Sequence, residues 1–506
     1  MERLYRLGKW PVFVYLLPVF FVLHGFTRNF YLISLADSLW LLSKYLVGVI
    51  IMHVAFFFIL RNNSRASLLA FLLMAIYLFF GAIHDALKWL LPDTFFSRYV
   101  FVLPFIVIVT ALFVVLISSI RNYSRYKAYL NVLFFIFIIT DLVILSGKIS
   151  SYGHRRQFQS LHKEFSACDT CNKPDVYLIV MDEYSGEKTL HDLFNFDNTA
   201  FLGDLKDRNF KIVKNSTSNY NITPVSIASL LNIDYVDVEG ASLKDVPMKR
   251  MYELIDTNKL VSFFKFLGYE FINNSIFTVN GQPPSVTQTI TPTGTSILKS
   301  QTLIERVKKD LGYHLINWHI LKSVREDDYA IMNNNNNIIG KIKDQARSAG
   351  KEPRFSYSHL TMPHFPYYFD SNGSPYAQSE IVEGKGNEWR EERYLEYLKY
   401  TNTVIVDLVD FVLKHSQKPP VIILLSDHGF RLHSKNGHEE YDFYNLNATF
   451  MPPQYSPAFE DNLSNISYMR ELLNLLFNQH LKAGQQDRFY LPITRQDIKG
   501  QSSGSE

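Results

Sequence analysis

The sequence lacks the features that mark several common classes of protein. Only two cysteines occur in 506 residues, which excludes a scaffold held together by many disulfides. There is no Walker A loop and no Gly-x-Gly-x-x-Gly fingerprint, which argues against nucleotide-dependent chemistry. Apolar residues make up 47% of the chain and aromatic residues 15%, and this composition excludes a disordered protein.

Charge is scarce at the N-terminal end of the chain. Residues 1–150 contain 13 Lys and Arg against 5 Asp and Glu, whereas residues 151–506 contain 38 against 43. The polar part therefore has no basic excess with which to bind nucleic acid. Five apolar stretches approach the ~20 residues that cross a bilayer, at residues 10–27, 39–60, 66–84, 99–120 and 128–147. We expect residues 1–147 to form a five-helix transmembrane domain.

The distribution of Lys and Arg predicts which way this domain faces. Eight of them lie before the first stretch and in the connections after the second and fourth, against five on the other side, where Lys44 is counted because it is near a helix end. Basic connections stay in the cytoplasm, so five spans place the chain after Gly147 outside. We expect a multi-pass protein of a bacterial inner membrane with a periplasmic or otherwise extracytoplasmic domain.

Residues 148–172 are polar and irregular, which indicates a juxtamembrane linker. They contain both cysteines, Cys168 and Cys171. A zinc site would need two further ligands, and there is no second cysteine pair. In an oxidising compartment we expect a small disulfide instead. At the other end of the chain, residues 495–506 form a polar tail.

From Pro174 onward the pattern alternates between strands and helices. Short, wholly apolar runs predict buried parallel strands, at Val176–Met181, Phe355–Leu360 and Val421–Leu425. Helical patterns occur at residues 224–231, 260–267, 303–324, 392–415 and 468–481. The alternation predicts that residues 173–494 form an α/β domain with a mostly parallel sheet. The run Asn333–Asn337 is expected at the tip of a loop.

The ends of the three predicted strands carry carboxylates and imidazoles. These are Asp182, Glu183, His359, His364, Asp427 and His428. In open α/β sheets, ligands bind outside the carboxyl ends of the strands. Oxygen and nitrogen ligands of this kind suit zinc or manganese. The sequence therefore predicts a metal site at this edge of the sheet.

Thr223 precedes Pro224 at the start of a predicted helix. This pair is typical of an N-cap followed by a first-turn proline, so a capping role alone explains it. A helix N-terminus also offers free N–H groups to a phosphate, and a metal-bound hydroxyl placed there can act as a nucleophile. The residues alone leave both interpretations open.

Four segments together resemble a known family. They are Pro-Asp-Val-Tyr-Leu-Ile-Val-Met-Asp-Glu, the turn before Ser-Ile-Ala-Ser-Leu-Leu-Asn, His-Leu-Thr-Met-Pro-His and Ser-Asp-His-Gly. They resemble the sulfatase-like branch of the alkaline phosphatase superfamily, over residues 173–485 by motif order. The membrane domain resembles, by architecture only, that of bacterial phosphoethanolamine transferases and of phosphoglycerol transferases similar to lipoteichoic acid synthase.

The resemblance implies a role for each candidate residue. One or two divalent ions, zinc or manganese, would be held by Asp182, Thr223, Asp427 and His428. Thr223 would be the nucleophile, and His364 would contact the substrate phosphate or serve the leaving group. Residues expected to bind substrate are His359, Arg431 and His438. Glu183 is expected to bridge to a second metal ion.

The chain also departs from the family pattern. Sulfatases use a Cys or Ser in a Cys/Ser-x-Pro-x-Arg motif, whereas Thr223 stands here, Pro224 follows at once and no Arg lies at the right place. Sulfate-ester hydrolysis is therefore disfavoured. The multiple disulfides common in phosphoethanolamine transferases are absent, which leaves the head group undecided.

We expect a membrane-anchored phosphotransferase. It would move phosphoethanolamine or phosphoglycerol from a membrane phospholipid donor to a glycan or lipid acceptor of the cell envelope. One alternative is a membrane-bound hydrolase of phosphate or sulfate esters that uses the same site. The other is a non-catalytic pseudoenzyme that binds an envelope polymer and holds no metal.

Overall fold

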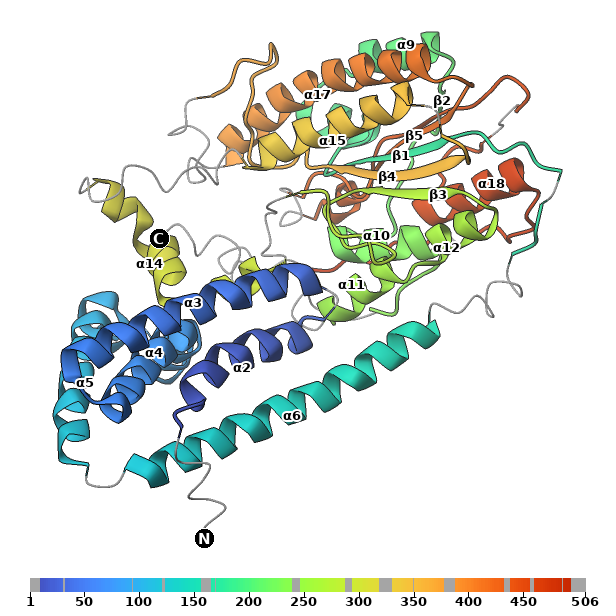
Figure 1. The fold of residues 1–506 in the computed structure, drawn as a ribbon. Helices are drawn as coiled ribbons and strands as arrows, with labels where there is room; N and C mark the ends of the chain where they lie inside the picture. The colour runs from blue at the N-terminus through green and yellow to red at the C-terminus, as the bar shows by residue number, and fades with distance from the viewer. Residues whose placement is uncertain are drawn as a thin grey trace. The chain divides into compact units, whose positions relative to one another are not determined.

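The structure is a computed structural model of the chain, in which two compact units can be described separately (Figure 1). One unit contains residues 1–155 and 291–324, and the other contains residues 156–290 and 325–500. The residues described are 10–30, 32–92, 94–120, 123–155, 165–168, 170–238, 246–286, 294–317, 330–348, 350–376, 387–431, 437–455, 459–484 and 486–492.

The first unit is helical and apolar. Its N-terminal helices are α2 (Phe13–Arg28), α3 (Leu35–Leu60), α4 (Asn63–Leu90), α5 (Tyr99–Ser119) and α6 (Tyr123–Arg155), with the short η1 (Phe95–Ser97) before α5. The last four are long and apolar enough to cross a membrane, and α2 is a shorter apolar helix. Large apolar side chains such as Val100 and Val107 on α5 are exposed, as hydrocarbon surroundings would favour. The prediction of a membrane domain with apolar helices is confirmed.

Polar side chains inside this unit bond to one another between helices. His24 on α2 lies 3.1 Å from a carboxylate oxygen of Asp141 on α6. His53 on α3 contacts the hydroxyl of Tyr15 at 2.8 Å and the side chain of Asn63 at 3.0 Å. Because lipid offers no hydrogen-bond partner, such pairs join the helices that carry them.

The second unit is built on one six-stranded sheet with the order β2-β6-β5-β1-β4-β3. Its strands are β1 (Val176–Met181), β2 (Lys211–Ile212), β3 (Glu270–Asn274), β4 (Arg354–Leu360), β5 (Val421–Ser426) and β6 (Asn447–Phe450). β5, β1, β4 and β3 run parallel, while β6 and β2 are antiparallel to their neighbours. The predicted α/β class and the three central strands are confirmed.

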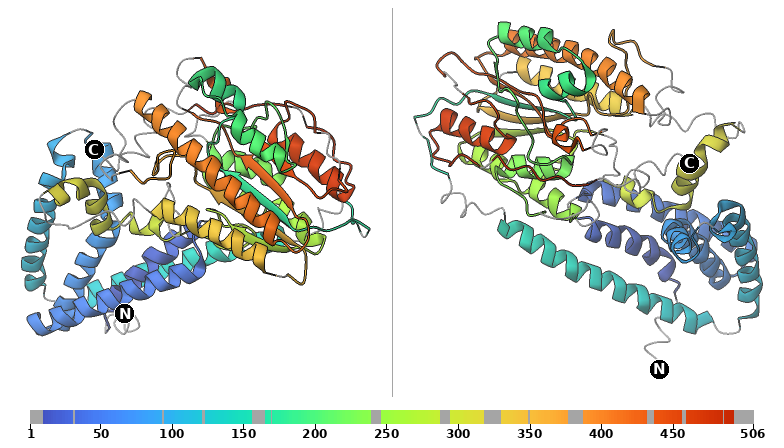
Figure 2. Two further views of the ribbon diagram at one scale, coloured as in Figure 1. Left: turned by 90° about the horizontal axis from the view of Figure 1, so that it is seen from above. Right: turned by 180° about the vertical axis from the view of Figure 1, so that it is seen from behind.

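Helices cover both faces of the sheet (Figures 1 and 2). On one face lie α10 (Thr223–Asn232), α11 (Met248–Asp256), α12 (Lys259–Phe266) and α18 (Asn465–Phe477). On the other lie α8 (Glu187–Phe194), α9 (Thr199–Asp207), α15 (Ala330–Arg347) and α17 (Asn387–His415).

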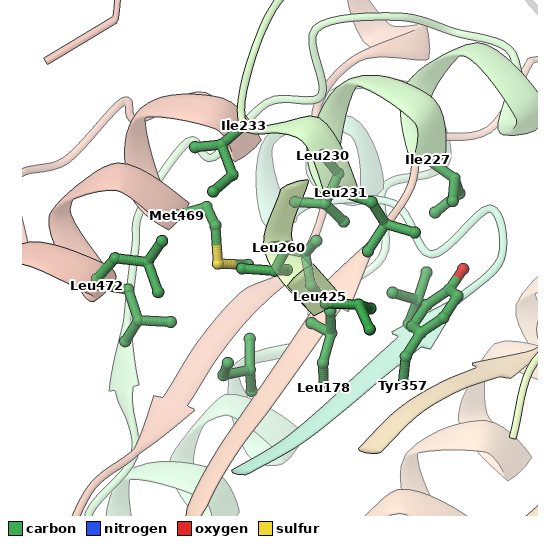
Figure 3. Packing of buried hydrophobic residues seen from close by; sticks show 14 of the residues in the cluster. Leu178, Ile227, Leu230, Leu231, Ile233, Leu260, Tyr357, Leu425, Met469 and Leu472 are labelled. Carbon is green, nitrogen blue, oxygen red and sulfur yellow. The ribbon is translucent and has the colours of Figure 1, made fainter. Parts of the chain in front are cut away.

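The alternation of side chains along β1 explains why it is wholly apolar. Val176, Leu178 and Val180 enter one core, and Tyr177, Ile179 and Met181 enter the other. In Figure 3, Leu178 of β1 and Leu425 of β5 pack beneath residues of α10 and α18. A strand covered on both sides buries every side chain, which makes its sequence easy to recognise.

Several local expectations change in the structure. The run Asn333–Asn337 lies within α15 and not at a loop tip, because Asn335 is buried and bonds through its side chain to both the backbone N–H and the carbonyl of Thr361. The expected linker begins as helix, since α6 continues to Arg155. Cys168 and Cys171 form a disulfide. The expected tail, residues 495–506, lies outside the described residues.

One segment of the expected catalytic domain belongs to the helical unit instead. Residues 291–324 belong to the helical unit, although they stand between β3 and α15 in the sequence. Within them, α13 (Ser296–Lys299) and α14 (Leu303–Asn317) are described. The α/β unit is therefore formed by two separate parts of the chain.

Candidate active site

The register of the sheet aligns the ends of three strands. Met181, the last residue of β1, pairs with Leu360 of β4 on one side and Ser426 of β5 on the other. Asp182 and Asp427 therefore leave the sheet at the same level. His359 lies one residue before the end of β4, at that edge.

An inner group of buried side chains lies at this edge. Asp182, His359 and Asp427 each place one ligand atom within 4.8 Å of the others, and their exposed fractions are 4%, 0% and 0%. Asp182 Oδ1, His359 Nε2 and Asp427 Oδ2 have no hydrogen-bond partner among the described residues. Buried polar atoms without partners are costly, and two carboxylates with an imidazole form a donor set that a divalent cation satisfies. The residues present fit a metal ion.

His428 joins this inner group in a defined tautomer. Its Nδ1 lies 2.8 Å from the carbonyl oxygen of Gly429, and a carbonyl only accepts, so the proton of the neutral ring is on Nδ1. The lone pair of Nε2 then faces the site. It lies 3.1 Å from Thr223 Oγ1, 3.3 Å from Asp427 Oδ2 and 3.8 Å from Asp182 Oδ1. The four residues expected to bind metal therefore lie close together.

Thr223 is the first residue of α10, and the N-cap position belongs to Ile222. The expected N-cap is thus displaced by one residue. The Thr223 hydroxyl forms a hydrogen bond with His428 Nε2. Thr223 is also partly exposed, so a substrate can reach it. The Ser226 hydroxyl, one turn further on, donates to the Asp427 carbonyl at 2.6 Å and joins the helix start to the end of β5.

An outer group lies nearer to solvent. The Arg431 guanidinium contacts Glu183 Oε1 at 3.2 Å through Nε and His364 Nε2 at 2.9 Å through Nη2. His364 Nδ1 donates to the Phe365 carbonyl, so in the neutral ring Nε2 accepts from Arg431. The side chains of His364 and Arg431 are 14% and 20% exposed, unlike those of the inner group. His364 and Arg431 are therefore more accessible than Asp182, His359 and Asp427.

The charges of the site oppose the effect of burial. Burial raises the pKa of Asp182, but the imidazoles of His364, His359 and His428 outweigh it and hold that pKa well below its usual value. Burial likewise raises the pKa of Glu183, but the nearby His364 and Arg431 have the larger effect, so this pKa is lowered overall. Burial lowers the pKa of His428. The arrangement favours ionised carboxylates beside a neutral imidazole, the forms in which both are metal ligands.

Two predicted substrate-binding residues lie apart from the outer group. His359 is fully buried, with Nδ1 2.9 Å from the Tyr357 hydroxyl and Nε2 3.6 Å from Asp182 Oδ2. His438 is exposed, and its described ring contact is with Tyr441. Arg431, the third such residue, stands in the outer group itself.

Two buried residues beside the site were missed by sequence reasoning. Tyr357 lies two residues before His359 on the same strand, so alternation places both on one face, and this spacing is the signal that would have found it. Asp442 is fully buried, and its backbone carbonyl accepts from the Gly429 N–H at 2.7 Å. The Asn221 side chain donates to Asp442 Oδ2 at 3.3 Å. Only the tertiary structure brings Asp442 next to Gly429, which follows His428, and next to Asn221, which stands two residues before Thr223.

Asp442 makes stability depend on pH. Burial raises the pKa of Asp442 from 3.8 to about 7, against the opposing effects of Asn221 and Arg431. Between these values the unfolded chain has lost the proton that the folded chain keeps, so stability falls as pH rises from about 4 to 7 and this contribution changes no further above that. The melting temperature of the wild-type protein in detergent is expected to fall as pH rises from about 4 to 7, and that of Asp442→Asn is expected to fall less. Parallel curves for the two proteins would contradict the raised pKa.

Comparisons with known proteins agree with this fold. The model of the sulfatase family matches residues 174–452, more than half of the chain, and the protein therefore belongs to the sulfatase family. No curated protein matches the sequence.

Three solved structures illustrate the similarity. The C-terminal periplasmic domain of EcEptC from Escherichia coli is 14% identical, with a TM-score of 0.38 over 61% of this chain and 84% of that one. The soluble domain of lipooligosaccharide phosphoethanolamine transferase A from Neisseria meningitidis is 12% identical, with a TM-score of 0.37 over 64% and 93%. The phosphonate monoester hydrolase SpPMH from Silicibacter pomeroyi is 14% identical, with a TM-score of 0.40 over 63% and 76%.

Proposed function

We propose that the protein is a metal-dependent, membrane-anchored phosphotransferase with an extracytoplasmic catalytic domain. It transfers the head group of a membrane phospholipid, phosphoethanolamine or phosphoglycerol, to a glycan or lipid of the cell envelope. The observation that carries this proposal is the group of three buried, unpartnered ligand atoms of Asp182, His359 and Asp427 beside the partly exposed Thr223 hydroxyl. The apolar helices of the same chain support a donor that stays in the bilayer.

The metal would be held by the inner group. Its ligands are Asp182, Asp427, His428 and Thr223, and the unpartnered Nε2 adds His359 to this set. A bound divalent ion lowers the pKa of a coordinated hydroxyl and offsets the charge of phosphoryl oxygens. Zinc and manganese both suit these donors. Glu183, in the outer group, would bridge to a second metal ion.

Thr223 performs the group transfer in two displacements. Its hydroxyl gives up its proton to water, its oxygen attacks the phosphorus of the donor and a P–O(Thr) bond forms, and the bond to the glycerol oxygen breaks, with a proton from His364 completing the diacylglycerol that leaves. An acceptor hydroxyl then attacks the same phosphorus, its proton passes to His364, and the P–O(Thr) bond breaks. His428 Nε2 lies 3.1 Å from the Thr223 oxygen, so the threonine already stands beside the lone pair that would bind the ion.

The outer group binds the phosphate that is transferred. Arg431 offers N–H donors to phosphoryl oxygens, and its contact with Glu183 keeps the guanidinium in one orientation before substrate arrives. His364 stands beside it and, when protonated, supplies the proton that the departing glycerol oxygen needs. These roles place substrate between the outer group and Thr223.

Product analysis tests the proposal. The full-length protein in membranes is given a phospholipid with a labelled head group, together with envelope lipid and glycan fractions. We expect diacylglycerol to form in equal amount to label on the acceptor. Label released as free head-group phosphate would instead identify a hydrolase that uses water. Absence of turnover, together with absence of bound metal in elemental analysis, would identify a non-catalytic binding protein and overturn the proposal.

A further inference from the structure

A segment that interrupts the α/β unit in the sequence is part of the helical unit. The chain leaves the α/β unit after β3, forms α13 and α14 within the helical unit, and returns to form α15. We call the described residues of this segment, 294–317, the docked insertion. The α/β unit is therefore joined to the helical unit both at the end of α6 and through this insertion.

The docked insertion approaches two membrane helices at glycines. The N–H of Gly81, in the second half of α4, donates to the carbonyl oxygen of Gln301 at 2.8 Å. A Cβ at Gly81 would lie only 2.9 Å from Gln301 Cα, so any larger residue would displace the backbone of the insertion. At Gly25 on α2, a Cβ would collide with the side chain of Leu298, which is 4% exposed. Both glycines thus permit close packing that a side chain would prevent.

Charged and polar pairs add to this packing. Arg306 of α14 forms an ion pair with Asp85 of α4. Asp310, one turn later, accepts a hydrogen bond from the Tyr99 hydroxyl of α5 at 2.6 Å and lies 3.8 Å from Lys88 Nζ. These contacts come from three helices of the chain, α4, α5 and α14, and fix the insertion at more than one point.

All these contacts are at one end of the bundle. Gly25 is near the end of α2, Asp85 and Lys88 are near the end of α4, and Tyr99 begins α5. Because successive spans alternate in direction, these positions are on the same side as the end of α6, from which the chain continues to the α/β unit. The insertion therefore contacts the helical unit near the end of the bundle from which the chain leaves α6.

We propose that the docked insertion is a second membrane attachment of the catalytic domain, independent of the linker after α6. The occupant of the surface formed by Gly25, Gly81, Asp85, Lys88 and Tyr99 is the chain's own residues 294–317. The consequence is specific: cutting the chain between α6 and β1 leaves the catalytic domain bound to the membrane. This holds whatever reaction the active site performs.

A cleavable linker tests the proposal. A site for a sequence-specific protease is inserted between Arg155 and Phe165 of the full-length protein, membranes are cut with the protease and washed with high salt, and the catalytic fragment is followed by immunoblot. We expect most of the fragment to stay in the membrane pellet. Its release from the otherwise unchanged protein would overturn the proposal, and activity plays no part in the measurement.

Variants show whether the docked contacts cause the retention. After cleavage, Gly81→Leu is expected to move most of the fragment to the supernatant. Gly48→Leu is the matched control, since it makes the same change in a membrane helix where a Cβ meets no atom within 4 Å. Retention of the Gly81→Leu fragment would overturn the proposal, because the fragment would then be held by something else.

An exchange of charges tests the same contacts if the Gly81→Leu protein fails to accumulate in membranes. Arg306→Glu places a like charge beside Asp85 and is expected to release the fragment after cleavage. Adding Asp85→Arg restores opposite charges and is expected to return the fragment to the pellet. Release that Asp85→Arg does not reverse would show that the pair does not hold the insertion, and would count against the proposal.

Discussion

Thr223→Ala is expected to abolish head-group transfer. Removal of a nucleophile costs on the order of a thousandfold or more in turnover number. The alanine has no oxygen to form the phosphothreonine intermediate, and no other hydroxyl is hydrogen-bonded to His428 Nε2 among the described residues. Bound metal is expected to remain, since Asp182, His359, Asp427 and His428 are unchanged. The measurement is diacylglycerol release from a labelled donor, with metal content determined on the same preparation.

Thr257→Ala is the matched control for this variant. It deletes the same atoms at the end of α11, where the hydroxyl donates only to the Glu253 carbonyl within its own helix, so turnover should be unchanged. Thr223→Ser should keep part of the activity because it restores an oxygen at the same position. Wild-type turnover in Thr223→Ala would show that the threonine is not the nucleophile and would favour direct attack by the acceptor.

Asp182→Asn is expected to remove both metal and activity. The amide has the shape of the carboxylate but lacks its charge, so the inner group loses one of its two anionic ligands. We expect metal affinity to fall by at least about a hundredfold, because affinity depends on the number of charged donors. Elemental analysis of the purified full-length protein, after dialysis against a weak chelator, measures this directly.

Asp204→Asn is the control for the loss of charge. Asp204 is exposed at the surface and lies 3.9 Å from Arg208, so its replacement should leave metal content and turnover at wild-type levels. Full metal occupancy in Asp182→Asn would mean that the ion is held elsewhere. Loss of turnover with full occupancy would assign Asp182 to the reaction and not to metal binding.

The central strands and the general position of the site could be predicted from the sequence. β1 and β5 are buried on both faces, so their sequences are continuous apolar runs and the residues that follow them stand out. β3, with the sequence Glu-Phe-Ile-Asn-Asn, was missed because it contains polar residues whose hydrogen bonds no apolar pattern reveals. The Asn273 amide, for example, bonds to three carbonyls in the loop that follows. β6, between β5 and the short edge strand β2, also alternates polar and apolar residues in the sequence Asn-Ala-Thr-Phe.

The sequence by itself determined the division into an apolar membrane part and an α/β part, because both follow from the local order of apolar and polar residues. It also identified the acidic and imidazole residues at the strand ends. Only the tertiary structure decided which of these residues meet. Thr223 and His428 are 205 residues apart, and His359 is buried with the inner group because β4 pairs in register with β1. The docked insertion likewise depends on close contacts of Gly25 and Gly81 with residues more than 200 positions away. Such long-range contacts depend on the packing of the whole fold, and no local pattern encodes them.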